Sequence, residues 1–344
     1  MILCVVTTIS YSQYQPGFLP EFFFGRQPSA RAESLGKAYS STLGDLGSVY
    51  FNAAGTATSN SIEINTSYTP PGFYSTKGFY TFLGVGSRVN KHLHLSLSQF
   101  QFNMGKTPVV NATTTPYVKR TILTISFQMR ENLFLGLNTN YFIWQPGIDE
   151  TSKAFYFDLG LIKTIKLNSR NTQKRAVNLG MSISNLNNAK INTTFNNISV
   201  IYHLPIVARF GASYVLNFGR KSHADSSSFV NLLTQIEYQT LLNSVYRSAI
   251  RVGQEITFSN FLSLRAGWYS EKVYDFGFPN DNKDYIAAFS YGLGVHLPLQ
   301  PLLKAPVDLQ FDFVSLPQPS YSKNYTMWNN FNTYGLRATY KIAK

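Results

Sequence analysis

The sequence predicts an all-β protein: a transmembrane, antiparallel, up-and-down β-barrel of about 14 strands with an N-terminal hatch or plug. Apolar and polar residues alternate along most of the chain, as they do in a strand with one apolar face. Only 14% of the residues are charged, whereas 44% are hydrophobic. No run approaches the ~20 apolar residues of a membrane-spanning helix. A closed barrel is the other structure that spans a bilayer.

A long alternating run between His203 and Leu216 illustrates the pattern. Its even positions hold Leu204, Ile206, Ala208, Phe210, Ala212, Tyr214 and Leu216. A soluble barrel turns its apolar face inward, whereas an outer-membrane barrel turns that face to lipid and keeps polar side chains in its lumen. The low charge favours the second arrangement. We therefore expect the even residues of this run to face lipid and Arg209, Gly211 and Ser213 to face the lumen.

The first 12 residues predict the end of a signal peptide. A short apolar run, Ile2–Ile9, is followed by Ser10, Tyr11 and Ser12, and we expect cleavage before Gln13. The alternative is that this segment is a first strand. Cys4 is the one cysteine of the chain, so cleavage would leave a mature protein without a thiol or a disulfide.

Residues 13–60 predict a compact segment folded into the mouth of the barrel. From Tyr14 to Asn60 the sequence does not alternate. It is rich in aromatic and small residues, with glycines at positions 25, 36, 44, 47 and 55. So many aromatic residues are not typical of a disordered leader.

Residues 61–344 predict the barrel itself. The alternating runs, each about 8 to 14 residues long, have the length that a tilted strand needs to cross a bilayer. The predicted strands are Ser61–Tyr68, Gly78–Arg88, His92–Met104, Arg120–Met129, Leu133–Trp144, Ala154–Lys166, Ala176–Leu186, His203–Leu216, Phe229–Tyr238, Val245–Phe258, Leu262–Tyr269, Tyr285–Leu297, Val307–Leu316 and Thr333–Ile342. An even number places both chain ends on the periplasmic side.

The lengths of the connections predict an orientation, because periplasmic turns are short and surface loops are long. The short turns are Val89–Lys91, Arg130–Asn132 and Ser259–Phe261, and the long loops are Gly105–Lys119, Asn187–Tyr202, Ser270–Asp284 and Pro317–Asn332. Two periplasmic connections, Leu167–Arg175 and Asn217–Ser228, are longer than this rule expects.

Two finer features follow from the aromatic and apolar positions. In His92–Met104 the leucines occupy odd-numbered positions, whereas Phe100 and Phe102 occupy even-numbered ones. This change predicts a bulge near Ser98 and Gln99 that moves the apolar side chains to the same face of the strand. Aromatic residues near strand ends predict an interfacial girdle. Its members are Phe142, Trp144, Trp268, Tyr269, Tyr285, Phe289, Tyr334 and Tyr340.

A net charge of +13 is typical of proteins that bind nucleic acid. Here the basic residues form no stripe with a binding motif, so we expect no nucleic-acid partner. Arg209, Arg251, Arg265 and Arg337 lie singly on predicted lumen faces. We expect Arg251, Arg265 and Arg337 to meet carboxylates on facing strands. The candidates are Glu237, Glu255, Asp308 and Asp312. We interpret these residues as a structural ion-pair network inside the barrel. The alternative is that they select an anionic solute.

Catalysis and metal binding are not expected. His92, His94, Ser96 and Ser98 share one strand face, but no acidic partner is evident that would orient either histidine. No third or fourth ligand accompanies the histidines, and His203, His223 and His296 are scattered. We predict no enzyme activity, no metal and no cofactor.

The segment Ser29–Gly55, SARAESLGKAYSSTLGDLGSVYFNAAG, carries a family resemblance. It resembles the N-terminal hatch signature of FadL-type channels for hydrophobic compounds and of the PorV and PorQ proteins of type IX secretion. Matching residues are Arg31, Ala32, Gly36, Ala38, Asp45, Asn52, Ala54 and Gly55. Ser34 and Lys37 stand where the signature prefers Gly, and Ala53 stands where it has Pro.

The C-terminal part resembles the PorV branch more than the FadL branch, over Phe261–Lys272, residues 291–300 and Val307–Leu316. This resemblance implies a protein of the bacterial cell outer membrane that acts in protein secretion and binds secreted cargo or translocon components. Its other expected partners are outer-membrane lipid and lipopolysaccharide. The alternative is a FadL-like passive channel for hydrophobic compounds, which requires an apolar pocket in the lumen.

Overall fold

The computed structural model describes residues 29–71, 78–109, 112–146, 151–167, 173–195, 198–219, 228–243, 248–272, 285–299, 306–316 and 330–341. The predicted signal peptide, residues 1–12, lies outside the described residues, as does the first part of the predicted hatch, residues 13–28. No helix among the described residues is long and apolar enough to cross a membrane.

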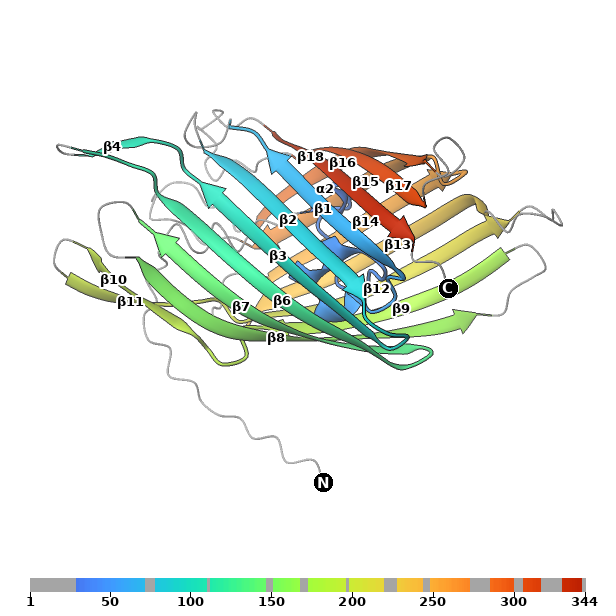
Figure 1. Ribbon diagram of the computed structural model, residues 1–344, viewed down its shortest axis with the longest axis horizontal. Coiled ribbons are helices and arrows are strands. Elements are labelled where there is room, and N and C mark those ends of the chain that lie inside the picture. Colours follow the sequence, from blue (N-terminus) through green and yellow to red (C-terminus); the bar gives the residue numbers. More distant parts are fainter. Residues whose placement is uncertain are drawn as a thin grey trace, which may run out of the picture.

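Fourteen strands of the described chain form one closed antiparallel barrel (Figure 1). They are β1 Ser61–Thr69, β2 Phe79–Arg88, β3 Leu93–Asn103, β6 Tyr117–Arg130, β7 Leu133–Gln145, β8 Ser152–Leu167, β9 Gln173–Ser184, β12 Val207–Gly219, β13 Ser228–Leu241, β14 Ser248–Phe258, β15 Leu262–Lys272, β16 Tyr285–Pro298, β17 Val307–Leu316 and β18 Phe331–Lys341. Each pairs with its neighbour along the chain, and β18 closes onto β1, where Lys341 lies opposite Ser61. The predicted all-β, up-and-down barrel of about 14 strands is confirmed.

Two short hairpins extend the barrel at the end that carries the long connections (Figure 1). One pairs β4, Thr107–Val109, with β5, Ala112–Thr114. The other pairs β10, Lys190–Phe195, with β11, Ile198–His203. We call this end the loop end and the opposite one the turn end.

The second hairpin corrects the predicted strand His203–Leu216. His203 ends β11, so β12 begins only at Val207. Leu204 therefore precedes the barrel strand and is fully buried instead of facing lipid, and Ala208 is buried as well. Further along β12 the predicted faces are correct, with Phe210 exposed and Arg209 turned inward.

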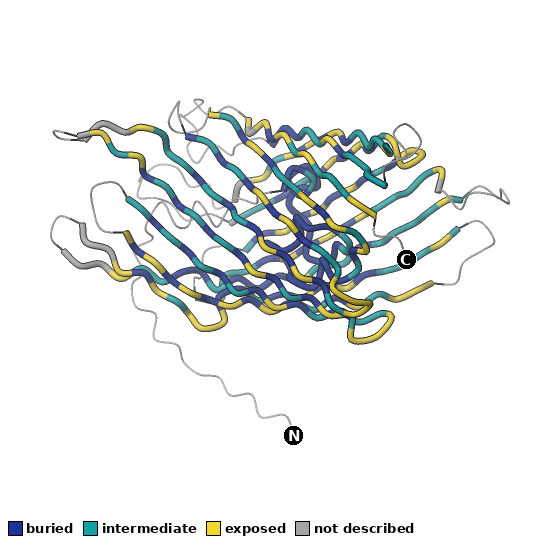
Figure 2. Tube along the Cα trace, in the orientation of Figure 1, coloured by how far each residue is buried: buried dark blue, intermediate teal, exposed yellow. Residues whose placement is uncertain are grey.

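The outer surface of the barrel is apolar. Along β8, Phe155, Phe157 and Leu159 are exposed, whereas Tyr156 and Asp158 between them are buried. The same alternation of exposed and buried residues runs along most strands (Figure 2). Exposed apolar residues on the other strands include Ile64, Leu83, Leu97, Leu123, Leu137, Met181, Ile236, Ile250, Leu264, Leu293, Phe311 and Leu336.

The predicted bulge in β3 is wrong. The pairing of β3 with β2 and with β6 runs without a register shift, and Phe100 and Phe102 lie on the same inner face as His94, Ser96 and Ser98. The sequence changes from polar to aromatic along one inward face, which a hydropathy pattern reads as a reversal of faces.

The predicted aromatic girdle is partly wrong because some of its aromatic residues lie on the inner face of the barrel. Phe142, Trp144 and Tyr269 are buried inside the barrel. Phe289, Tyr334 and Tyr340 do point outward near strand ends, and Trp268 is half-buried. The side chain of Tyr285 lies outside the described residues.

A test of the outer face compares Ile236→Arg with Tyr340→Arg. Ile236 is exposed near the middle of β13, and Tyr340 is exposed one residue from the end of β18. We expect Ile236→Arg to lower the free energy of unfolding from lipid vesicles by about 2–4 kcal/mol, because a charge at the bilayer midplane loses its hydration. Tyr340→Arg, near an interface, should lower it by about 0–1 kcal/mol. Equal losses in denaturant titrations would contradict the assigned depth.

Candidate functional site

Residues 29–60, which we call the inner segment, lie inside the barrel (Figures 1 and 2). The segment contains three short helical pieces: α2, Ala30–Ser34; η1, Leu46–Tyr50; and η2, Ala53–Thr56. Each piece is preceded by an N-cap residue whose side chain accepts a hydrogen bond from a backbone N–H of the first turn, as is typical of helix N-termini. The Ser29 hydroxyl accepts from Ala32 at 3.3 Å, and the side chains of Asp45 and Asn52 each cap the next piece in the same way.

The inner segment is seated against glycines of the barrel wall. A Cβ atom placed on Gly136 would lie 2.2 Å from the carbonyl carbon of Ala53, and one on Gly267 would lie 1.9 Å from the nitrogen of Gly36. No side chain fits at either position, so the main chain of the segment touches the main chain of the wall. The other wall glycines in such close contact are Gly160, Gly180, Gly211, Gly253 and Gly292.

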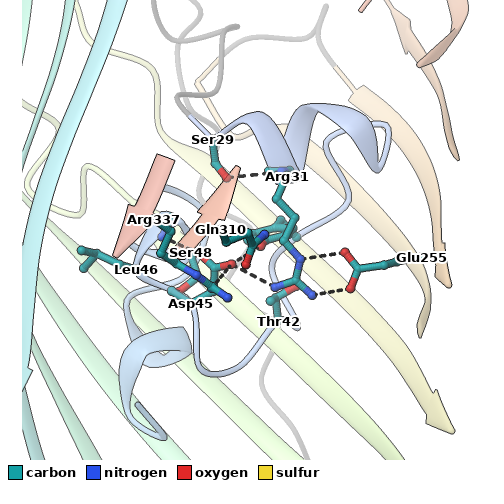
Figure 3. Close-up of polar contacts among 12 residues, drawn as sticks. Ser29, Arg31, Thr42, Asp45, Leu46, Ser48, Glu255, Gln310 and Arg337 are labelled. Atoms are coloured by element: carbon teal, nitrogen blue, oxygen red, sulfur yellow. Dashed lines mark hydrogen bonds and ion pairs between the residues drawn. The ribbon is translucent and has the colours of Figure 1, made fainter. Parts of the chain in front are cut away.

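A chain of ion pairs joins the inner segment to the wall (Figure 3). Arg31 donates two hydrogen bonds of 2.8 Å to Glu255 and a third, of 2.9 Å, to Asp45. Asp45 also accepts from the Tyr39 hydroxyl at 2.7 Å and from Arg337 at 3.3 Å. Such charge-assisted and bidentate contacts are the strong class of hydrogen bond.

The chain continues on the wall side. Arg265 donates to Glu255 and, at 2.6 Å, to Asp312. Gln310 donates to both oxygens of Asp312, at 2.9 and 2.8 Å. Positive and negative groups therefore alternate from β17 through β15 and β14 to the inner segment and on to β18, which lowers the cost of burying each charge.

Burial of the Asp45 carboxyl works against its ionisation, but Arg337 and Arg31 outweigh that effect and hold its pKa below the usual range. A carboxyl with a lowered pKa contributes stability above its unfolded pKa and loses it as the pH falls through the folded pKa. The contribution of Asp45 is therefore fully present at neutral pH.

A second set of polar residues holds the turn after α2. Glu237 accepts the backbone N–H of Tyr39 at 3.0 Å and that of Ser40 at 2.7 Å, and its other oxygen pairs with Arg251 at 3.0 Å. Arg209 bonds to Gln239 at 3.1 Å. Among the described residues, Arg209 has no carboxylate within ion-pair distance.

A further buried ion pair, separate from these two sets, was not predicted from the sequence. Arg120 pairs with Asp158 at 2.8 Å, and both are buried. Asn138 and Asn140 also donate to Asp158, at 3.0 and 2.9 Å, and the Arg120 guanidinium lies 4.8 Å from the centre of the Tyr50 ring. The alternation along β8 was enough to predict that Asp158 faces the barrel interior. Its partner Arg120 can be identified only from the pairing of β6 with β7 and of β7 with β8.

The structure therefore brings Glu255, Arg265, Asp312 and Arg337 of the predicted lumen charges together around the inner segment. Arg209 and Arg251 lie nearby at Gln239. Asp308 is apart from them: it pairs with Lys341 at 2.7 Å, where both side chains are partly exposed.

The predicted hatch-motif residues have distinct positions. Gly36 has φ of +62° and Gly55 lies against Ser48, where a Cβ would meet the Ser48 hydroxyl oxygen at 2.2 Å. Ala38 is fully buried. Lys37, where the signature prefers Gly, also adopts a positive φ, of 65°, which explains the preference. Ala53, where the signature has Pro, is the first residue of η2, a position that suits proline but does not require it.

Above the inner segment, on the loop-end side, the barrel interior holds packed, buried aromatic rings that we call the aromatic cluster. Its wall members are Tyr80, Phe82, Phe100, Phe102, Phe142, Trp144 and Tyr156, and its inner-segment members are Tyr39, Tyr50 and Phe51. The rings of Tyr80 and Phe102 stack with centroids 4.4 Å apart, and Tyr50 meets Phe100 edge-on at 6.1 Å. Sequence reasoning missed this cluster because it assigned the apolar face of every strand to lipid.

Comparison with known proteins identifies the fold. No model of a known protein family and no curated protein matches the chain. Among solved structures, the Pseudomonas putida toluene transporter TodX is similar, with a TM-score of 0.51 at 9% sequence identity, covering 91% of this chain and 98% of that one. A TodX mutant, described as a monoaromatic hydrocarbon channel, gives 0.50 at 8% identity, covering 91% and 99%. A Pseudomonas aeruginosa FadL homologue gives 0.47 at 10% identity, covering 92% and 99%.

At these identities the likeness to TodX shows a shared barrel fold and nothing about function. TodX is described as a toluene transporter and its mutant as a monoaromatic hydrocarbon channel. The channel function and the secretion function both remain predictions from the sequence resemblance.

Removal of Arg31 tests whether the ion-pair chain holds the inner segment. We expect Arg31→Gln to lower the free energy of opening of the backbone amides between Tyr39 and Phe51, measured by hydrogen exchange, by about 1.5–3 kcal/mol. The reason is that the hydrogen bonds of a charged group are lost. Lys166→Gln is the control, since Lys166 and its partner Glu131 are 3.7 Å apart and both exposed. Unchanged protection in Arg31→Gln would show that the glycine contacts suffice alone.

Proposed function

We propose that this chain is an outer-membrane protein through which small hydrophobic molecules pass. The observation that carries the proposal is the aromatic cluster, a set of large buried rings turned into the lumen of a barrel whose outer surface is already apolar. A barrel that conducts water-soluble solutes has a polar interior. An aromatic lining instead suits a hydrophobic ligand held by shape and ring contacts.

The apolar outer surface supports a location in the membrane. Exposed leucine, isoleucine and phenylalanine residues surround the barrel, far beyond the apolar patches that soluble proteins tolerate. Lipid is the environment that covers such a belt, and closed antiparallel barrels of this kind belong to the bacterial outer membrane. We therefore propose outer-membrane lipid and lipopolysaccharide as the surroundings of the protein.

The inner segment is proposed to act as the plug of this channel. It is buried, capped and ion-paired to the wall, so it blocks direct movement along the axis. A hydrophobic molecule entering at the loop end would meet the aromatic cluster before it reached the segment. TodX and its mutant are described as a toluene transporter and a monoaromatic hydrocarbon channel, which makes toluene the first probe to test here.

The double variant Phe100→Ala, Phe102→Ala tests this function. Each ring contact contributes about 0.5–1.5 kcal/mol, so we expect the purified variant to bind toluene roughly tenfold more weakly in equilibrium dialysis. Toluene uptake by cells that contain equal amounts of each protein should slow in parallel. The matched control is Phe155→Ala, because Phe155 is an exposed ring on the outer face. The proposal fails if wild-type protein does not bind toluene, or if the control weakens binding as much as the double variant.

A further inference from the structure

Two lysines lie near each other on the outer face of the barrel, close to the loop end. Lys119 of β6 and Lys153 of β8 are both opposite Ile143 of β7, the strand between them (Figure 1). Lys153 is exposed, and Lys119 and Ile143 are partly exposed on strands whose alternate residues are buried. All three therefore point outward, with about 10 Å between the Cα atoms of the two lysines. We call these three residues the loop-end row.

Basic residues are rare elsewhere on the outer face. Among the side chains that the structure describes and that alternation places on the outside of the barrel strands, three others are basic and none is acidic. They are Arg130, Lys163 and Arg175, on β6, β8 and β9. Arg130 and Lys163 repeat the arrangement near the turn end, where both are opposite Leu133. Outward cations are thus confined to one wall of the barrel.

The outward residues between these two levels are uncharged. Next to the loop-end row are Tyr141 and Phe155, whose rings stack with centroids 4.6 Å apart. An apolar surface that ends in aromatic rings and then in lysines is the order expected where lipid chains meet headgroups. The other outward residues between the two levels are Thr121, Leu123, Ile125, Phe127, Leu135, Leu137, Thr139, Phe157, Leu159 and Leu161.

The separation of the two levels matches the thickness of the apolar part of a bilayer. Lys163 follows Lys153 by ten residues along β8. Ten residues span ~34 Å along a strand. A strand tilt of ~35–45° reduces this length to roughly 24–28 Å along the membrane normal, and the apolar band of an outer-membrane barrel is ~25 Å tall. The loop-end row therefore lies at the level of lipid headgroups.

The charge of the loop-end row is not neutralised by the protein. Among the described residues, no carboxylate lies within ion-pair distance of Lys119 or Lys153. The turn-end level differs, because Glu131 lies in the turn after Arg130 and is 3.7 Å from Lys166. Cations at the headgroup level attract anionic lipids. A lysine amine carries three hydrogen-bond donors, and phosphate oxygens accept strong, charge-assisted bonds from it.

We propose that Lys119 and Lys153 bind a phosphate group of one lipid molecule in the loop-end leaflet, and that Tyr141 and Phe155 contact its acyl chains. Long loops belong to the cell surface in barrels of this kind. The lipid is therefore lipopolysaccharide, the phosphorylated lipid of that leaflet. The proposal rests on the outer-membrane location proposed above but not on the passage of hydrophobic molecules.

Lipid binding to the purified protein tests this proposal. Native mass spectrometry from neutral detergent measures the affinity for two probes, lipopolysaccharide without its O-chain and the same lipid after enzymatic removal of its phosphates. We expect wild-type protein to bind the phosphorylated probe at least about tenfold more tightly, because hydrogen bonds between charged groups are lost with the phosphate. The double variant Lys119→Gln, Lys153→Gln should lose this preference and bind the dephosphorylated probe as wild-type protein does.

The matched control is Lys91→Gln, Lys166→Gln, which removes the same charge from two exposed lysines at the turn end. It should keep the preference. Lys119→Arg, Lys153→Arg should keep it too, which separates loss of charge from loss of folding. An equal loss in the control, or wild-type protein without a preference, would overturn the proposal. Displacement of the lipid by millimolar inorganic phosphate would also overturn it, since the row would then bind free phosphate.

This proposal and the channel function fail separately. The lysine variants leave the aromatic cluster intact, so their binding of toluene should equal that of wild-type protein. If the phosphate preference is present and toluene binding is absent, the lipid site stands and the channel function fails. The opposite result keeps the channel function and overturns the lipid site.

Discussion

The structure depends on a close approach between two main chains, that of the inner segment and that of the barrel wall. The wall glycines that permit it are paired across neighbouring strands: Gly136 faces Gly160, Gly180 faces Gly211, and Gly253 faces Gly267. They form a band at one level of the lumen, where a larger residue would collide with the segment. Because the wall presents no side chains there, the segment fits inside a barrel of only 14 strands.

The ion pairs then fix the segment within that band. Arg31 and Asp45 come from the segment, whereas Glu255 and Arg337 come from strands on the wall. Buried charges are costly when a partner is removed, so each half of the network requires the other in place. Without the segment, Glu255 would lose its bidentate partner Arg31 and Arg337 its contact with Asp45, so the ion pairs favour the position of the segment seen here.

The sequence was sufficient to predict the barrel, because period-2 alternation is a local property. β8 shows this well: its exposed phenylalanines and buried polar residues alternate without interruption. The partners of buried charges were harder to predict. Arg265 and Glu255 are only ten residues apart on adjacent strands, and their pairing follows from a hairpin register. Arg31 lies 224 residues from Glu255, and nothing in the local pattern predicts that pair.

Most of the errors in assigning residues to the inner or outer face concern one region of the barrel interior. Phe100, Phe142, Trp144 and Leu204 were all assigned to lipid or to its interface, and all belong to the buried cluster above the inner segment. Hydropathy does not distinguish an apolar side chain that faces lipid from one that faces an apolar lumen, so the rule fails wherever the lumen is apolar. A membrane barrel usually has apolar residues outside and polar residues inside. Departures from such a pattern are expected at functional sites, where residues are selected for function and not for folding. An inward aromatic wall adds nothing to the contact with lipid. Its concentration at the loop end, against the rings of Tyr39, Tyr50 and Phe51 of the inner segment, is the observation on which the proposed binding of a hydrophobic solute rests.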